Sequence, residues 1–281
     1  MRIIAVFKKD ERIRHIGHLD IQRAVQRGLR RSGLPVAYSS GFNPHILVTF
    51  ASALSTGAWG EREIMDVKMA EEVTPDTFLR AMNKAMPPEL RLLEARRVED
   101  RFPAMMASLR AAAWDIVFRD QKDAEKMLSV LASMMQKENI PALRKTKTGL
   151  RECDIKPLIY SVRGENPHLF ATLALTEGEA CKPVMLLEAL RREAKLPDEQ
   201  EIRVLIGRKA LYGEENGRLI PLEHLGEAGE ESGKTPGDRR EPRKDGLGIQ
   251  ADDRERLKDG LGIQLDGRER LKDGREIKQK A

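Results

Sequence analysis

The chain has 281 residues, 40% hydrophobic and 34% charged, with a formal net charge of +5. No stretch approaches the ~18 apolar residues of a membrane span, and the short apolar start has no signal-peptide cleavage site, so we expect a cytoplasmic protein without membrane contact. Two cysteines, Cys153 and Cys181, are too few for a disulfide scaffold or an iron–sulfur cluster.

The first hundred residues predict the element order β-α-β-β-α-β. The predicted elements are a strand at Ile3–Phe7, a helix from Leu19 that Gly33-Leu34-Pro35 ends, strands at Ile46–Phe50 and Glu63–Met69, a helix opened by Thr74-Pro75-Asp76 and ended by Pro87-Pro88, and a strand at Leu90–Val98. This order is typical of ferredoxin-like units.

Residues 110–212 repeat the same order less cleanly. The predicted elements are strands at Ala112–Phe118, Ile155–Val162, Leu169–Leu175 and Ile202–Leu211, and helices at Asp123–Gln136 and Pro183–Ala194. We therefore predict an α+β fold of two tandem ferredoxin-like units, at residues 1–100 and 110–212. A single continuous α+β sheet is the alternative that the same elements allow.

Residues 213–281 form a charged, low-complexity tail with a period of fourteen residues. Lys244–Gln250 recurs at Lys258–Gln264 and in part at Lys272–Lys278. Each unit supplies few apolar side chains, too few to offset the ~1–2 kcal/mol per residue that ordering a backbone costs. We expect most of this tail to be disordered, and the alternative is a short array that binds a partner.

Basic residues are concentrated at the start of the chain. Residues 1–50 hold nine Lys and Arg against three acidic residues. Arg23, Arg27, Arg30 and Arg31 recur along one side of the first predicted helix, and no acidic residue lies between Asp20 and Arg31. A solvated helix face is one interpretation, and contact with RNA phosphates is the other.

The beginning of this helix carries a second basic group. Arg14, His15 and His18 lie where free backbone N–H groups favour an anion, so they are candidates for a phosphate or carboxylate site. His18 and Asp20 could instead only complete the helix start around Gly17. A metal site of His15, His18, Asp20 and His45 is disfavoured because the first two fall at the edge of the helix. We expect no metal and no cofactor.

Two loops complete the candidate site residues. The first loop consists of residues around Gly41, and its candidates are Tyr38, Ser39, Gly41, Phe42, Asn43 and His45. It either contributes stacking or hydrogen-bonding groups beside the arginines or is a compact loop anchored by Phe42. The second, residues 144–157, is a phosphate-facing loop or a solvated connector, with Lys145, Lys147 and Arg151 as candidates for anion binding. His18 and His45 are catalytic candidates if both imidazoles reach one pocket.

Four segments resemble the radical SAM-linked protein family: His15–Asp20, Arg30–Ser39, Gly41–His45, and Lys145–Arg151 with Asp154–Pro157. The resemblance covers about residues 1–212. Gly17 departs from it, because the family usually has Ser there, and Ile46-Leu47 replaces the usual Pro and basic residue. Members occur alone or attached to B12-type radical SAM proteins, often near RNA-processing genes, which implies a companion role without an established reaction.

The sequence therefore favours a non-catalytic companion of a radical SAM or RNA-processing enzyme that contacts tRNA or rRNA. One alternative is a protein partner of a radical SAM enzyme that does not contact RNA. Another is an RNA-processing or RNA-modifying enzyme that uses His18 and His45.

Overall fold

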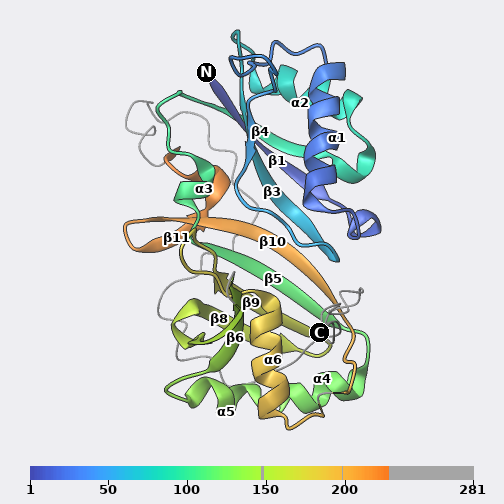
Figure 1. Cartoon of the computed structure of the whole chain (residues 1–281), viewed down its shortest axis with the longest axis vertical. Helices are drawn as coiled ribbons and strands as arrows, with labels where there is room; N and C mark the ends of the chain where they lie inside the picture. Colours follow the sequence, from blue (N-terminus) through green and yellow to red (C-terminus); the bar gives the residue numbers. More distant parts are fainter. Residues whose placement is uncertain (147–148, 198, 228–281) are drawn as a thin grey trace, which may run out of the picture.

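One mixed sheet runs through both halves of the chain (Figure 1). The computed structural model describes residues 1–146, 149–197 and 199–227, with the side chains of Lys145 and Thr146 left out. Within these residues the sheet has nine strands, in the order β4-β1-β3-β10-β5-β9-β8, with β2 paired to β3 and β11 paired to β10. The single continuous α+β sheet predicted as the alternative is therefore confirmed, whereas the division into two tandem ferredoxin-like units stays a prediction.

The first half supplies four strands and two long helices to this structure. Its elements are β1 (Arg2–Lys9), η1 (Glu11–Ile13), α1 (His18–Arg31), β2 (Val48–Phe50), β3 (Ala58–Lys68), α2 (Pro75–Ala85), η2 (Pro88–Leu90) and β4 (Leu92–Val98). β1 pairs antiparallel with both β3 and β4, and β2 pairs antiparallel with β3. The half-sheet order is thus β4-β1-β3-β2.

The second half supplies the remaining strands. Its elements are α3 (Met105–Ser108), β5 (Ala111–Phe118), α4 (Gln121–Leu128), α5 (Leu131–Gln136), β6 (Pro141–Thr146), β7 (Gly149–Asp154), η3 (Lys156–Leu158), β8 (Ile159–Glu165), β9 (His168–Ala174), α6 (Pro183–Glu193), β10 (Val204–Glu215), β11 (Arg218–Pro221) and η4 (Leu222–His224). β5 pairs antiparallel with β9 and β10, and β8 pairs antiparallel with β9.

The two halves join through a short parallel pairing of β10 with β3, in which Gly207 lies opposite Trp59. A Cβ on Gly207 would come within 2.4 Å of the Trp59 ring, so the indole needs glycine on the neighbouring strand. The seam therefore depends on a close approach of backbone and aromatic ring.

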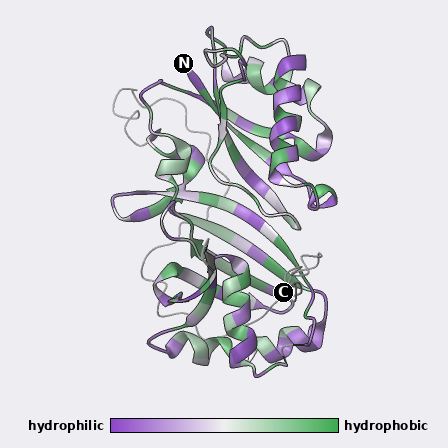
Figure 2. Cartoon of the chain, viewed as in Figure 1, coloured by the Kyte–Doolittle hydropathy of each residue, from purple (hydrophilic) through white to green (hydrophobic). Residues whose placement is uncertain are grey.

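Helices α1 and α2 cover one face of the first half-sheet (Figure 1). Ile21, Val25 and Leu29 recur every four residues on α1, so they form one apolar face that packs in the same core as Phe7 and Met65 of the sheet. Figure 2 shows the resulting alternation of hydrophobic and hydrophilic residues along α1. The arginines are left on the outer face.

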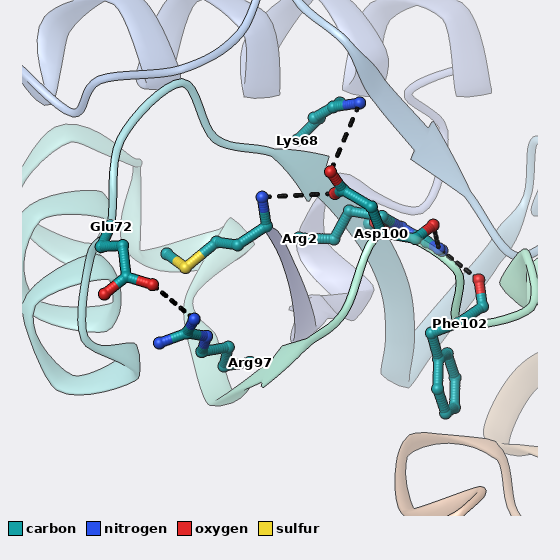
Figure 3. A network of polar contacts seen from close by, with 8 residues as sticks. Arg2, Lys68, Glu72, Arg97, Asp100 and Phe102 are labelled. Atoms are coloured by element: carbon teal, nitrogen blue, oxygen red, sulfur yellow. Dashed lines mark hydrogen bonds and ion pairs between the residues drawn. The ribbon is translucent and has the colours of Figure 1, made fainter.

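A network of charges holds the start of β1 in place (Figure 3). The amino group of Met1 lies 3.2 Å from Asp100. Arg2 pairs with the buried carboxylate of Asp66 on β3, 3.1 Å between Nε and Oδ1, and donates to the carbonyl of Phe102. Each cation at this end of the strand therefore has an acceptor.

Three sequence predictions require correction. The predicted helix Asp123–Gln136 is two helices, α4 and α5, because the chain turns at Ser129 and Val130. The run 144–157, predicted as a phosphate-facing loop or a solvated connector, includes the end of β6 and all of β7, which pair with each other. The prediction that the tail starts at residue 213 places this boundary too early, since residues 213–227 include β11 and the fully buried Leu222. Residues 228–281, with the fourteen-residue repeats, lie outside the described residues.

Within the described ranges, no helix has both the length and the apolar composition needed to span a membrane.

Candidate functional site

The outer face of α1 carries fewer unpaired arginines than the sequence predicts. Arg23 binds Asp20, with 2.8 Å between Nη1 and Oδ1, and Arg31 donates to the carbonyl of Ala85 at 2.7 Å. Arg27 and Arg30 are exposed, and neither has a hydrogen-bond or ion-pair partner in the described part of the chain. The cationic surface available to a ligand therefore centres on Arg27 and Arg30.

The N-terminus of α1 has free backbone donors. Gly17 is the N-cap residue and supplies no side-chain cap, and Asp20 turns to Arg23 rather than capping the helix. The N–H groups of His18 and Leu19 have no acceptor among the described residues, as expected of a first helical turn. Arg14 is partly buried against the carbonyl of Glu11, and the side chain of His15 is exposed. These donors make this helix end electropositive.

The loop at residues 38–46 is closed by its own polar side chains. Ser39 and His45 interact twice: Oγ lies 2.8 Å from Nδ1, and the backbone N–H of His45 donates to the same Oγ at 3.1 Å. Gly41 takes a positive φ of 114°, which glycine adopts readily. Phe42 is fully exposed and Tyr38 is half-exposed, so Phe42 does not anchor the loop. Asn43 is exposed as well.

His18 and His45 do not share a pocket. The His18 ring packs edge-on against Phe50, 5.3 Å between centroids, whereas His45 binds Ser39. Phe50 lies five positions after His45 along a largely extended segment, which at ~3.3 Å per step spans about 16 Å. The arrangement required for acid–base catalysis by this pair is absent from the structure.

The second basic cluster lies in the other half of the molecule, on the β6–β7 hairpin (Figure 1). Arg151 is exposed and lies directly opposite Arg144 on the neighbouring strand. The Lys145 side chain and the whole of Lys147 fall outside the described residues. The structure therefore does not unite this cluster with the arginines of α1.

A polar cluster that the sequence did not reveal lies beneath the start of α1. Lys9 at the end of β1, Glu63 on β3 and Arg208 on β10 are buried, with exposures of 2%, 4% and 1%. Arg208 makes two bonds to Glu63: 2.8 Å from Nε to Oε1 and 2.5 Å from Nη2 to Oε2. Arg208 also donates to Ser52, and its guanidinium lies 5.5 Å from the centre of the Trp114 ring. This cluster links β3 to β10 at the seam of the two halves.

Lys9 is held differently from Arg208. Its Nζ donates to two carbonyls, 3.0 Å to Arg14 and 2.9 Å to Ala58, and no carboxylate of the described residues lies within 4 Å of it. Burial lowers the pKa of Lys9 to about 8, with Glu63 and Arg208 acting in opposite directions on it. Burial also lowers the pKa of His18, which favours the neutral imidazole. Lys9 is therefore a buried cation whose direct partners are carbonyl oxygens rather than a carboxylate.

A narrow cavity opens beside this cluster. Its polar lining comes from Lys9, His18, Ser52 and Glu63, and Phe7 and Phe50 form part of its apolar wall. The volume open to the centre of a water molecule is about 10 Å³, close to the ~10–15 Å³ that one water needs. The cavity thus admits an atom or two rather than a whole metabolite.

One signal in the sequence points to Lys9. Ile3, Ala5 and Phe7 lie on the face of β1 that packs in the same core as α1, and Lys9, two residues after Phe7, lines one cavity with it. Its neighbours Glu63 and Arg208 are 54 and 199 residues further along the chain, and nothing local joins them. No group of three or more His, Cys, Asp or Glu side chains suited to a metal lies within residues 1–146, 149–197 and 199–227.

Comparison with protein families gave one finding. A family model described as "uncharacterized protein conserved in bacteria" (DUF2344) matches residues 2–183, which include α1, the loop at 38–46, Lys9 and Glu63 but not Arg208. No curated protein matched the sequence.

Proposed function

This chain belongs to the DUF2344 family of proteins conserved in bacteria, and we propose that it is a non-catalytic companion protein that contacts RNA through α1. The observation that carries the proposal is the exposure of Arg27 and Arg30 without an anionic partner in the described part of the chain. Two like charges three residues apart on a helix repel each other by ~0.2–0.5 kcal/mol. A phosphate backbone along the helix relieves this repulsion.

The loop at residues 38–46 supports contact with single-stranded RNA. Six residues separate it from the end of α1, and its closure by Ser39 and His45 holds Phe42 fully exposed. A base that stacks on an exposed aromatic ring contributes ~1–3 kcal/mol to binding. Cations on α1 and aromatic rings on the following loop are the two components that sequence-tolerant RNA contact requires.

The companion role rests on the chemistry of the site and on the resemblance of the sequence. The two imidazoles that a catalytic role would use lie far apart, and the exposed groups of α1 bind rather than react. We propose that the enzyme served is a radical SAM or RNA-processing enzyme, with tRNA or rRNA as the shared ligand. The exposed side chain of Phe42 also favours a second candidate function, in which the protein contacts the surface of that enzyme without binding RNA.

We also propose that each half of the chain is a ferredoxin-like unit. The orders β4-β1-β3-β2 and β10-β5-β9-β8 repeat the same antiparallel arrangement, and helices lie in the equivalent crossovers. On this proposal the β6–β7 hairpin is an insertion into the second unit.

The test is RNA binding by the full-length protein. Fluorescence anisotropy with labelled tRNA and with a 5′-hydroxyl single-stranded RNA would compare the wild type with the double variant Arg27→Ala/Arg30→Ala. The control is Arg119→Ala/Arg203→Ala, which removes the same charge from exposed positions in the second half. We expect affinity to fall at least tenfold in the first variant and less than twofold in the control.

Two results would count against RNA contact. Equal losses in both variants would mean that only net charge matters, and no binding by the wild type at low salt would exclude RNA as the ligand of α1. In the second case, capture of a co-expressed radical SAM protein by the wild type, lost in Phe42→Ser, would favour the protein-only companion.

A further inference from the structure

Lys9 differs from the other buried cations of the described residues in having no carboxylate partner. Arg208 is bound by Glu63, and Arg191 lies 3.3 Å from Glu188. Arg2, at the opposite end of the same strand as Lys9, is neutralised by Asp66. A buried ion that lacks a directly bound counter-charge is costly, and buried ionisable groups with perturbed pKa values gather at functional sites.

The Glu63 carboxylate of this cluster forms its ion pair with Arg208 rather than with Lys9. Both oxygens of Glu63 are bound by the guanidinium of Arg208, and the two charges act on the Lys9 pKa in opposite directions. Lys9 uses two of its three N–H donors on the carbonyls of Arg14 and Ala58. One donor and one positive charge are left beside the cavity that Lys9 lines.

Further donors lie close to this charge. His18, the first residue of α1, lines the same cavity, and its own N–H and that of Leu19 have no acceptor in the described chain. The first turn of a helix with free N–H groups attracts anions, and most strongly dianions. The buried ammonium, the imidazole and the free N–H groups thus belong to one small region.

We propose that this cavity binds the terminal phosphoryl group of a phosphomonoester, with the Lys9 ammonium and the first turn of α1 as its donors. The cavity has room for about one oxygen atom, so the rest of the phosphoryl group lies at the mouth, against α1. A phosphodiester has two substituted oxygens and presents no such terminal group. This inference goes beyond the RNA contact proposed above and does not require it, because Arg27 and Arg30 lie on the opposite face of the helix.

A terminal phosphoryl group occurs on a free nucleotide, on inorganic phosphate and on a 5′-phosphorylated RNA end. Calorimetric titration of the full-length protein with inorganic phosphate, AMP and acetate would test the chemistry. Two RNAs of one sequence, with a 5′-phosphate or a 5′-hydroxyl, would separate an RNA end from a free ligand. The variant is Lys9→Met, and the matched control is Lys8→Met on the next position of the strand, which is half-exposed and paired with Asp10.

We expect AMP to bind at least tenfold more tightly than acetate, and this binding to be lost in Lys9→Met and kept in Lys8→Met. A tenfold preference for the 5′-phosphorylated RNA that is also lost in Lys9→Met would identify an RNA end as the source of the phosphoryl group. Equal binding of the two RNAs would identify a free phosphomonoester as the ligand. Loss of 5′-hydroxyl RNA binding in Arg27→Ala/Arg30→Ala, with AMP binding intact, would separate this site from the arginine face.

A measurement on the wild type keeps the proposal testable if Lys9→Met does not fold. Addition of phosphate should shift the backbone amide signals of His18 and Leu19 in a saturable manner in NMR spectra. Unshifted amides, acetate binding as tight as AMP binding, or undiminished AMP binding by a folded Lys9→Met variant would each overturn the proposal.

Discussion

The buried ammonium of Lys9 makes a specific prediction about stability and pH. In the folded protein the pKa of Lys9 is lowered from 10.5 to about 8 by burial, so between these two values the unfolded chain binds a proton that the folded chain has released. Stability therefore rises with pH across this window. Below pH 8 both states are protonated and the folded state bears the whole cost of the buried charge. The shift corresponds to about 3 kcal/mol, at ~1.4 kcal/mol per pKa unit.

Cys181 acts on stability in the opposite direction. Burial raises the pKa of Cys181 from 9.0 to about 12, so the unfolded chain loses this proton first and stability falls with pH above about 9. The difference between the wild type and Lys9→Met cancels this contribution, because both proteins contain Cys181.

The assay is urea unfolding of both proteins, followed by circular dichroism at pH 7, 8.5 and 10. We expect the wild type to gain about 2–3 kcal/mol relative to Lys9→Met between pH 7 and 10, since nearly the whole 8-to-10.5 window is crossed. A difference that stays constant with pH, or that changes in favour of Lys9→Met as pH rises, would refute the assignment of Lys9 as a buried cation without a directly bound carboxylate.

Two further predictions concern the seam and the end of the described chain. Arg208→Met should destabilise the fold by ~3–5 kcal/mol because it removes the hydrogen-bonded ion-pair partner of the buried Glu63 carboxylate. Combining it with Glu63→Leu should recover much of that loss. Thermal unfolding of both variants would show this recovery, and additive losses would contradict it. Leu222→Ala should lower the free energy of unfolding by ~2–5 kcal/mol because replacing a fully buried leucine leaves a cavity. A change below about 0.5 kcal/mol in chemical denaturation would contradict the assignment of residues 213–227 to the folded part of the chain.

The helix α1 could be predicted from the sequence because its information is local. Ile21, Val25 and Leu29 recur at the helical spacing, and Gly17 and Gly33 lie at its two ends. For the same reason the sequence correctly predicts that Arg27 and Arg30 lie on the exposed face of the helix. The pairing of Arg23 with Asp20 was available from their spacing of three residues, and the sequence prediction overlooked it.

The seam could not be predicted in the same way. Arg208 and Glu63 are 145 residues apart, and only the pairing of β3 with β10 brings them together. The β6–β7 hairpin was hidden by its like charges, because Arg144 and Arg151 face each other across it and such pairs are normally avoided. The charged composition of the run suggested a solvated loop instead.

The most direct test of the RNA contact is the salt dependence of binding. Each phosphate contact contributes about 0.7–0.9 to the slope of log K against log salt concentration. Removal of Arg27 and Arg30 should therefore lower the magnitude of the slope for single-stranded RNA by about 1.4, at ~0.7 per contact, while the slope of Arg119→Ala/Arg203→Ala stays at the wild-type value. An unchanged slope in Arg27→Ala/Arg30→Ala would contradict contact between α1 and the RNA backbone.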